Sequence, residues 1–398
     1  MRIKVLPDDF AVKEVLAVPL AAGGRYAVYR AQKRAITTLQ LRNRLAAALD
    51  LSPSAVTFPA LKDRQAVAVQ FGTVRGAGPR QVKGQGFTAE RVGWLDRPLS
   101  PGDVAGNRFS VVLRDLSRGE VAQVTARLAD MARWGLPNYF DDQRFGSRLA
   151  GGEFPGRLIL RRDESGALRA HLTGRQIGDP PEVRTFKAFA AEHWGDWQAL
   201  LARAPRPSNY RSVLTYLCDH PEGYRRALNL ITPRVLSLYL AAYQSFLWNR
   251  LAGRYLQAQL AAANVPLVTI DVAGESLPVY GQLTEDLVAS LSDLKLPLLH
   301  HRAQPDSPMV ASFIETILQE EGFLLRDLKA RVLKKAYLSK GARALLLFPQ
   351  DVTWGAAEAD ERFSGRHKLT ARFFLARGGY ATLLFKAAGT ADERFDTG

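Results

Sequence analysis

The order of strand-like and helix-like segments along the chain is the feature that most constrains its fold. Apolar residues alternate over residues 10–12, 26–29 and 109–113, which is typical of β-strands. Over residues 150–342 they mostly recur at spacings of three and four, which is typical of helices, with a strand-like interval at 265–281. Strand patterns then return beyond this region. The sequence therefore predicts a mainly helical segment placed between two strand-rich ends.

Because strands occur at both ends, the outer segments can complete one sheet around an inserted domain. A chain of 398 residues also exceeds what one hydrophobic core usually serves. We therefore expect an α+β protein with one discontinuous domain, residues 1–149 and 343–398, around a central mixed or antiparallel sheet. Residues 150–342 are expected to form a mainly helical α+β insertion domain.

Local signals predict several individual elements. One helix is expected from about residue 37 to residue 49, with Thr38 as its N-cap, and a second near residues 120–134. At the C-terminal end, two strands are expected within residues 371–386, joined by a hairpin turn at Gly378 and Gly379.

The charge of the chain favours a polyanionic partner. It carries 54 Lys and Arg residues against 39 Asp and Glu, a formal net charge of +15, and its sequence pI is about 10.0. An anionic membrane is the competing partner, but no apolar run approaches the roughly 20 residues that a spanning helix needs. The N-terminal residues MRIKVLPDDF turn acidic before a signal-peptide core could form. We therefore expect a cytoplasmic protein that does not act at a membrane.

No cofactor or metal site is expected. Cys218 is the only cysteine, so it can form neither an intrachain disulfide nor a thiolate cluster for zinc. The adjacent histidines His300 and His301 lack the spacing of a metal-binding helix face. Gly76 and Gly78 lie in a glycine-rich stretch without the strand-turn-helix context of a phosphate-binding loop. These features also argue against a nucleotide cofactor.

Two polar clusters are candidates for a functional site. The first is Lys62-Asp63-Arg64, in a turn between two apolar stretches; taken alone, such a triplet is usually a solvated turn with a surface ion pair. The second, residues 138–146 (NYFDDQRFG), is rich in aromatic, amide and guanidinium groups. Its aromatic rings could simply be core, but a ring beside an amide and a guanidinium is also what a flipped base needs for stacking and hydrogen bonding.

Six segments, in this order, resemble the TruD family of pseudouridine synthases, and together they span nearly the whole chain. Each alone is a weak signal, whereas six with consistent spacing are specific. The segments are residues 4–14 (KVLPDDFAVKE), 61–70 (LKDRQAVAVQ), 106–109 (GNRF), 137–146 (PNYFDDQRFG), 242–249 (AYQSFLWN) and 345–350 (LLLFPQ).

The resemblance implies a pseudouridine synthase domain made by both chain ends and interrupted by a helical TRUD insertion, here similar to the longer insertion of archaeal and eukaryotic relatives. It implies isomerisation of uridine to pseudouridine in tRNA, at position 13 of the D arm, with the target base flipped out. The uracil would be cut from C1′, rotated and rejoined through C5. This chemistry involves no redox change or external group, so it needs no cofactor. We expect a monomer whose partner is tRNA.

The resemblance also implies roles for individual residues. Asp63 matches the catalytic aspartate, acting as nucleophile towards the sugar or as base at C2′. Lys4 matches a lysine near that carboxylate. Phe140 matches the ring that stacks on the target base, and Asn138 the amide that orders the catalytic loop. Arg64 could pair with Asp63, bind a phosphate or be solvated.

The rest of the second cluster is expected to assist. Gln143 and Arg144 are expected either to contact the substrate or, together with Tyr139, to support the loop. The chain departs from the family pattern at Asp141, where glycine is usual, and at Ala68, where threonine is usual. Because glycine reaches positive φ more readily than aspartate, the backbone at Asp141 could differ from that of the family.

Two other functions remain open at the level of sequence. The chain could modify other tRNA sites or messenger RNA, or it could be an RNA-binding or RNA-folding protein with incidental activity. The intact Lys62-Asp63-Arg64 and Asn138-Tyr139-Phe140 triplets argue against a lost activity, because a binding protein needs basic and aromatic residues but no particular aspartate. Gln244 and Asn249, within residues 242–249, are expected to brace the insertion, although either could reach RNA.

Overall fold

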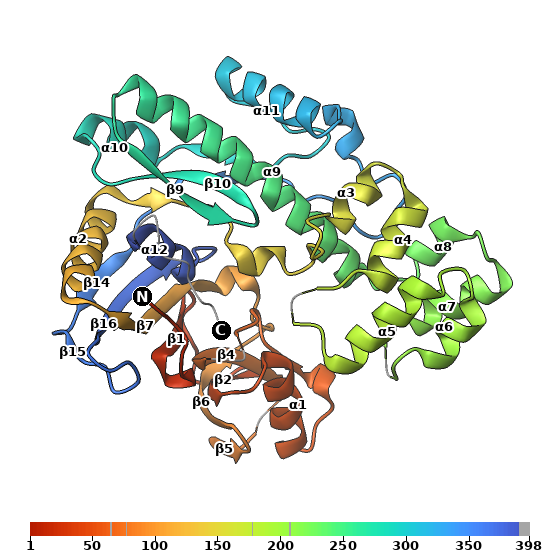
Figure 1. Ribbon diagram of the computed structural model, residues 1–398. Coiled ribbons are helices and arrows are strands. Elements are labelled where there is room, and N and C mark those ends of the chain that lie inside the picture. Colours follow the sequence, from red (N-terminus) through yellow and green to blue (C-terminus); the bar gives the residue numbers. More distant parts are fainter. Residues whose placement is uncertain (64–65, 77, 177, 207, 390–398) are drawn as a thin grey trace. The chain divides into compact units, whose positions relative to one another are not determined.

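The chain divides into two compact units in the computed structural model, which describes residues 1–63, 66–76, 78–176, 178–206 and 208–389 (Figure 1). Unit 1 combines Met1–Leu136 with Leu347–Gly398, and unit 2 is the continuous segment Pro137–Leu346. The short strands β8 (Leu136–Pro137) and β13 (Leu346–Leu347) span the two boundaries. The sequence-based boundaries were placed after residues 149 and 342.

Unit 1 is built on a ten-stranded mixed sheet with the order β14-β16-β7-β1-β4-β2-β6-β5, in which β15 also pairs with β16 and β3 with β4. β1 and β4 are parallel, and the other neighbours are antiparallel. The strands are β1 (Phe10–Leu16), β2 (Tyr26–Arg34), β3 (Val56–Thr57), β4 (Val67–Arg75), β5 (Gln81–Gly84), β6 (Phe87–Leu95), β7 (Val104–Leu116), β14 (Gln350–Trp354), β15 (Glu358–Ala359) and β16 (His367–Ala376). Because β16 pairs with β7, the C-terminal segment completes the N-terminal sheet, as the sequence predicts.

The helices of unit 1 cover the two ends of one sheet face. They are α1 (Thr38–Ala48), α2 (Arg118–Trp134) and α12 (Ala381–Ala388), with short 3-10 turns η1 (Pro7–Asp9), η2 (Pro53–Ala55) and η3 (Pro101–Asp103). α1 packs on β3 and β5, and α2 packs on α12, β7 and β16. The central strands β1 and β4 lie between these two groups. Val12 of β1 is directly opposite Ala68 of β4, and both face the buried side.

The start of α1 differs from the prediction by one residue. Thr37, not Thr38, is the N-cap: its hydroxyl accepts from Gln40 N (3.1 Å), and the Gln40 side chain accepts from Thr37 N. The predicted Thr38 cap is wrong because that side chain is buried, where it contacts Gln70. α2 begins in the same way, with Ser117 and Glu120 forming a capping box.

The predicted C-terminal hairpin is wrong as well. The chain turns at Gly378, where φ is +92°, but then forms α12 rather than a second strand. Alanines at both ends favour a helix, and the helix buries Leu383, Leu384 and Phe385. Phe385 packs edge-on against Phe373 of β16 with ring centroids 5.8 Å apart. Packing against the sheet therefore outweighs the local turn signal.

Unit 2 is mainly helical and is organised around α9 (Pro233–Ala262), a 30-residue helix. α3, α11 and β10 pack against it. The hairpin β9-β10 and the antiparallel strand pair β11-β12 complete the unit, and the hairpin confirms the strand-like interval in the sequence. The remaining elements are η4 (Asp142–Phe145), α3 (Pro155–Leu160), α4 (Glu164–Thr173), α5 (Pro181–Glu192), α6 (Trp197–Arg203), α7 (Arg211–Asp219), α8 (Tyr224–Leu228), β9 (Leu267–Val272), β10 (Glu275–Tyr280), α10 (Glu285–Ser292), β11 (Lys295–Pro297), α11 (Pro308–Glu320), η5 (Leu325–Leu328) and β12 (Ala342–Ala344).

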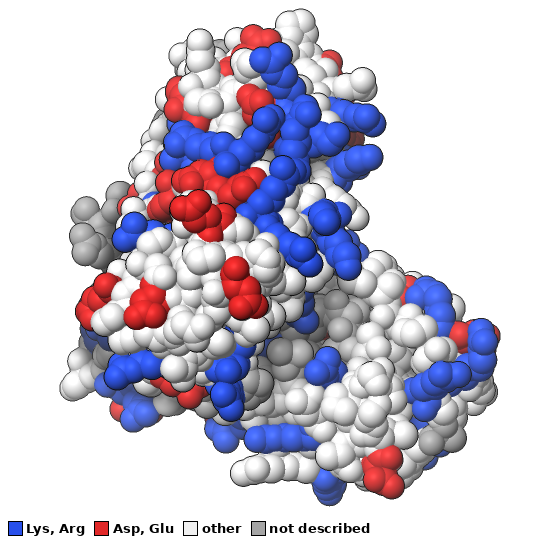
Figure 2. Space-filling view, turned by 90° about the vertical axis from the view of Figure 1, so that its right-hand side faces the viewer, with Lys and Arg blue, Asp and Glu red and all other residues white. Residues whose placement is uncertain are grey.

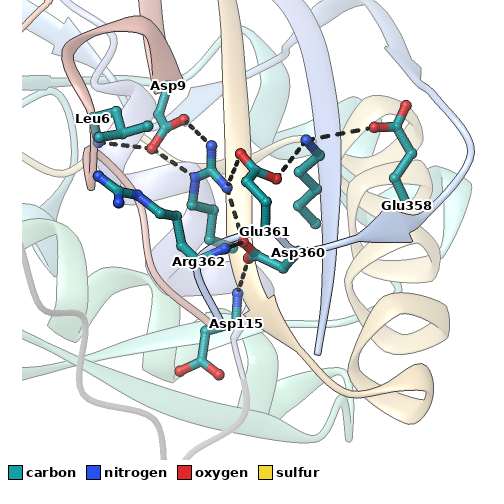
Figure 3. Close-up of polar contacts among 9 residues, drawn as sticks. Leu6, Asp9, Asp115, Glu358, Asp360, Glu361 and Arg362 are labelled. Atoms are coloured by element: carbon teal, nitrogen blue, oxygen red, sulfur yellow. Dashed lines mark hydrogen bonds and ion pairs between the residues drawn. The ribbon is translucent and has the colours of Figure 1, made fainter. Parts of the chain in front are cut away.

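A buried ionic cluster joins distant segments of unit 1 (Figure 3). The Arg114 guanidinium on β7, 4% exposed, donates to both carboxylate oxygens of Asp9 at 2.9 Å and to Asp360 at 2.9 Å. Glu361 lies 3.0 Å away. Asp9 also accepts from Leu6 N at 2.8 Å, so it holds the turn η1 that precedes β1. These hydrogen bonds, those to Asp9 above all, raise the pKa of Arg114. One arginine thus ties the chain near residue 9 to the chain near residue 360.

Candidate active site

Asp63 lies in the loop before β4 and is partly open to solvent. Its side chain is 43% exposed, and Oδ2 lies 2.8 Å from the ammonium nitrogen of Lys4. The Lys4 ammonium is also 4.5 Å from the ring centroid of Phe10, so an aromatic face stabilises it from a second side. The structure therefore brings together two sequence-predicted residues that are 59 positions apart.

The backbone at Lys4 is strained. Its φ is +58°, in the left-handed region that residues other than glycine rarely adopt, at a cost on the order of 1 kcal/mol. The surrounding chain imposes this conformation, because Arg2 exchanges two backbone hydrogen bonds of 2.8 Å with Arg114 just before it, and η1 begins shortly after it. Strain maintained in this way is often found at functional sites.

A second lysine, which the sequence analysis missed, holds the backbone of Asp63. Lys33 on β2 is fully buried, and its ammonium donates to the carbonyl oxygen of Asp63 at 2.5 Å. Burial lowers the pKa of Lys33 to about 8, although the negative charge of Asp63 opposes this shift. From Tyr29 onward, buried and exposed positions alternate along β2, and Lys33 stands at a buried one after Tyr29 and Ala31. A lysine at an inward strand position was the available sequence signal.

Lys62, beside Asp63, contacts different partners. Its ammonium lies 2.9 Å from the buried Glu14 carboxylate and donates to Asn107 Oδ1 at 2.6 Å. Glu14 also accepts from Phe71 N (2.8 Å), so one carboxylate on β1 contacts both the loop that carries Asp63 and β4. Glu14 and Asn107 both lie in segments that resemble the family. Through Lys62 they fix the loop that carries Asp63. Arg64, predicted to support Asp63, lies outside the described residues, and its role stays a prediction.

In unit 2, the backbone of Phe140 is clamped by the side chain of Asn249 on α9. Asn249 Oδ1 accepts from Phe140 N and Asn249 Nδ2 donates to Phe140 O, both at 2.8 Å. The Phe140 ring meets Trp248 edge-on at 5.6 Å and is 9% exposed. Asn249 is itself buried, as is Gln244, and both amides are bonded to the protein backbone. Both amides therefore brace unit 2, as expected, and their buried positions argue against the alternative that they reach RNA.

Arg343, which was also missed, links the Phe140 ring to Asn138. Its guanidinium lies 4.1 Å from the ring centroid of Phe140 and donates to Asn138 Oδ1 at 2.6 Å and to Asn138 O at 2.7 Å. Arg144 lies 5.5 Å from the same ring and donates to Ser245 Oγ at 3.0 Å. The predicted residues Asn138, Phe140 and Arg144 thus form one cluster, in which Arg343 joins Asn138 to the Phe140 ring and Arg144 contacts the same ring.

The other members of the second cluster are placed apart from the Phe140 ring. Tyr139 is fully buried and donates to Pro278 O at 2.8 Å. Gln143 is exposed on η4 and has no hydrogen-bond partner for its side chain among the described residues. Asp141 has φ −95° and ψ 172°, an extended conformation that needs no glycine. Ala68 on β4 is buried and lies opposite Lys33 on β2. Neither departure from the family pattern thus requires an unusual backbone.

The Asp63 group belongs to unit 1 and the Phe140 group to unit 2. Within the described ranges, no three His, Cys, Asp or Glu side chains lie close enough together to hold a metal ion. None of the described helices is both long and apolar enough to cross a membrane.

Comparisons of the fold and of the sequence with known proteins both lead to one family. The crystal structure of a Methanosarcina mazei protein assigned to TruD superposes with a TM-score of 0.69, covering 97% of this chain and 92% of that one at 21% identity. That likeness shows the fold: a mixed α+β architecture with a helical insertion, as the sequence predicts. The family model described as tRNA pseudouridine synthase D (TruD) matches residues 1–387.

The chain therefore belongs to the TruD family of tRNA pseudouridine synthases, which are isomerases. Similar proteins include the tRNA pseudouridine synthase D of Aquifex aeolicus, 26% identical over 99% of both chains. Two others are named as probable tRNA pseudouridine synthases D. That of Methanococcus maripaludis is 26% identical over 97% of this chain and 98% of its own, and that of Pyrobaculum arsenaticum is 30% identical over 100% and 94%.

Proposed function

We propose that this protein isomerises uridine 13 in the D arm of tRNA and that Asp63 is its catalytic carboxylate. The observation that carries the proposal is the half-exposed Asp63 side chain, paired with Lys4 at 2.8 Å and held through its backbone by Lys33. A carboxylate with one free side can approach a ribose, while the loop that carries it stays fixed. The RNA position rests on the family resemblance.

The reaction needs only the groups of this chain. Asp63 either attacks C1′ or removes the proton from C2′, and in both cases the C1′–N1 bond breaks and the uracil leaves as an anion. The freed base rotates and C5 bonds to C1′, which regenerates the Asp63 carboxylate or returns the C2′ proton. The proton on C5 is then lost to solvent, and N1 gains a proton. Lys4 balances the charge of the carboxylate before the first step and after the last.

Phe140 is proposed to stack on the flipped uracil. Its backbone is clamped by Asn249, and Trp248 and Arg343 flank its ring. A fixed ring costs little entropy when a base binds to it, and stacking on an aromatic ring is worth ~1–3 kcal/mol per base. Arg343 and Arg144 add positive charge beside that ring, where a phosphate or an anionic uracil would be stabilised.

Nucleotide-resolution mapping of pseudouridine tests the proposed position. We expect the purified protein to convert uridine 13 in an unmodified tRNA transcript and to leave a transcript with cytidine at that position unchanged. Conversion of other uridines instead would keep the enzyme and overturn the D-arm assignment. No conversion in any RNA tested would overturn the function itself.

Lys33 provides a pH-dependent prediction for the same reaction. Below pH 8 the ammonium form holds the Asp63 carbonyl, and above it the charge is lost, so we expect kcat to fall through pH 8. Lys33→Met should lower kcat by about 10–100-fold, because a misplaced catalytic group costs rates of this order. The fall centred near pH 8 should be absent from its pH profile.

Stability separates this positioning role from a folding defect. The pKa of Lys33 is lower in the folded than in the unfolded chain, so its charge disfavours folding below pH 8, and stability should rise between about pH 8 and 10.5. Lys33→Met should therefore not lower the melting temperature at pH 7, and exposed Lys13→Met on β1 serves as the control. If kcat of the Lys33→Met variant still fell near pH 8 as in the wild type, this role would be ruled out.

A further inference from the structure

The segment that starts within η5 and ends just before β12 is unusually basic. Residues 326–340, which we call the basic strap, contain six Lys or Arg residues and one acid, Asp327. Asp327 accepts from the backbone N–H of Leu324 and so serves the turn η5. The six cations are all exposed: Arg326, Lys329, Arg331, Lys334, Lys335 and Lys340.

The basic strap is irregular in conformation but firmly attached. Its apolar residues point inward, with Leu328, Val332 and Leu338 buried. Gln244 of α9 accepts from Ser339 N (3.1 Å) and donates to the carbonyls of Ser339 (2.8 Å) and Leu299 (2.9 Å). Further along, Asn229 accepts from Lys334 N at 2.9 Å and donates to Val332 O at 2.8 Å. The cations are thus presented from a fixed backbone.

Elsewhere on the surface, exposed arginines commonly have acidic partners. Arg30 pairs with Glu90, Arg34 with Asp8 and Arg108 with Asp351. By contrast, none of the six strap cations has a carboxylate within ion-pair distance among the residues that the structure describes. Their charge is therefore available to an outside partner.

The Gln244 clamp also brings a second basic segment to the strap, because Leu299 precedes His300, His301 and Arg302. The pKa of His301 is lowered by burial and then by the charges of Arg302, Lys329, Lys340 and Arg331. Four cations from two segments therefore lie close enough to one imidazole to act on it. Such a concentration of like charge is unfavourable unless a polyanion relieves it.

An aromatic residue, Tyr337, lies in the strap between Lys335 and Lys340 in sequence. Tyr337 is 76% exposed, whereas Tyr29, Tyr139 and Tyr243 are fully buried. An isolated exposed tyrosine has nothing to stack on in the free protein. A ring flanked by lysines is suited to a partner that offers both phosphates and flat bases.

We propose that the basic strap, with Arg302 and Tyr337, is a binding surface for the RNA substrate, in which the cations contact phosphates and Tyr337 stacks on an unpaired base. Figure 2 shows Lys and Arg side chains gathered on the side of the molecule that it views. This inference rests on the proposed function for the identity of the RNA. The one carboxylate of the strap, Asp327, is bonded to the backbone of the turn η5, so the surface supplies affinity rather than chemistry.

RNA fits this surface better than an acidic protein does. A protein partner with carboxylates would pair with the cations but would give Tyr337 no flat face. RNA also explains the spacing, since cations on both sides of a ring can follow the backbone on both sides of a stacked base. An acidic protein that competes as well as RNA would decide against the proposal.

Binding of an unmodified tRNA transcript at several salt concentrations tests the surface. The triple variant Lys329→Ala/Arg331→Ala/Lys340→Ala should raise Kd about tenfold or more at 0.15 M salt and flatten the salt dependence, because each lost phosphate contact removes ~0.7–0.9 from the slope. Tyr337→Ala should raise Kd about tenfold, and Tyr337→Phe should not. At saturating tRNA, kcat should be unchanged in every variant.

Matched controls make the result specific. Lys83→Ala/Arg118→Ala/Arg184→Ala removes three exposed cations outside the strap, and Lys329→Arg/Arg331→Lys/Lys340→Arg keeps the strap charge; both should bind as wild type does. Equal losses in the first control, or a Kd for the alanine variant within twofold of wild type, would overturn the proposal. If wild type isomerises uridine 13 while the alanine variant binds normally, only this inference fails. If wild type isomerises nothing while the variant binds weakly, only the proposed function fails.

Discussion

Asp63→Asn is expected to lower isomerisation by at least about 10⁴-fold while leaving the Kd for tRNA within about twofold. The amide has nearly the shape of the carboxylate and can still contact Lys4, but it is neither a nucleophile towards C1′ nor a base for C2′. Release of tritium from tRNA labelled at uridine C5 measures the loss, because the C5 proton leaves only when the new glycosidic bond has formed.

Asp351→Asn is the matched control for this change. Asp351 is 62% exposed and pairs with Arg108 at 2.8 Å, much as Asp63 pairs with Lys4, so its replacement alters the net charge in the same way. The control should isomerise at the wild-type rate. Normal turnover by Asp63→Asn would show that another group carries the reaction.

Arg114→Leu is expected to lower the free energy of unfolding by about 3–5 kcal/mol. The change removes the guanidinium from Asp9 and Asp360 and leaves both carboxylates buried without their partner. Asp360 keeps hydrogen bonds from two backbone N–H groups, those of Asp115 and Arg362, which satisfy it only in part. Urea-induced unfolding followed by circular dichroism measures the difference.

Arg108→Leu on the same strand provides the comparison. Arg108 is 55% exposed and its partner Asp351 is exposed too, so the loss should be less than about 1 kcal/mol. Replacing Asp9 and Asp360 by Asn in the Arg114→Leu background should recover part of the stability, because it removes the stranded charges. If Arg114→Leu were no more harmful than Arg108→Leu, the cluster would not hold unit 1 together.

The sequence predicts the features of the fold that arise from periodicity. Alternating apolar residues locate strands β1, β2 and β7, and the helical middle locates the insertion. Local signals fail where a tertiary contact competes with them. Thr38 could cap a helix, but its side chain is buried and hydrogen-bonded to Gln70 instead. Gly378 permits a turn, but the apolar residues after it form a helix that packs on α2.

The residues of the candidate site could be predicted only where the residue type and its motif indicate a chemical role. Asp63, Lys4, Phe140 and Asn249 belong to recognisable motifs, but Lys33 and Arg343 do not. Lys33 and Asn249 act on the backbone of Asp63 and Phe140 from 30 and 109 positions away. Such contacts depend on strand register and helix packing, which a single sequence does not specify. A polar residue at an inward strand position is the signal that could have pointed to Lys33.

The position of β16 beside β7 has a consequence for synthesis of the protein. About 250 residues separate the end of β7 from the start of β16. At ~5–20 residues per second, the ribosome therefore starts to synthesise β16 roughly 12–50 s after it completes β7. During that time β7 is an open edge, able to pair with a strand of another nascent chain. Unit 2 is continuous and can fold meanwhile. Newly made chains should therefore depend most on chaperones between completion of β7 and arrival of β16.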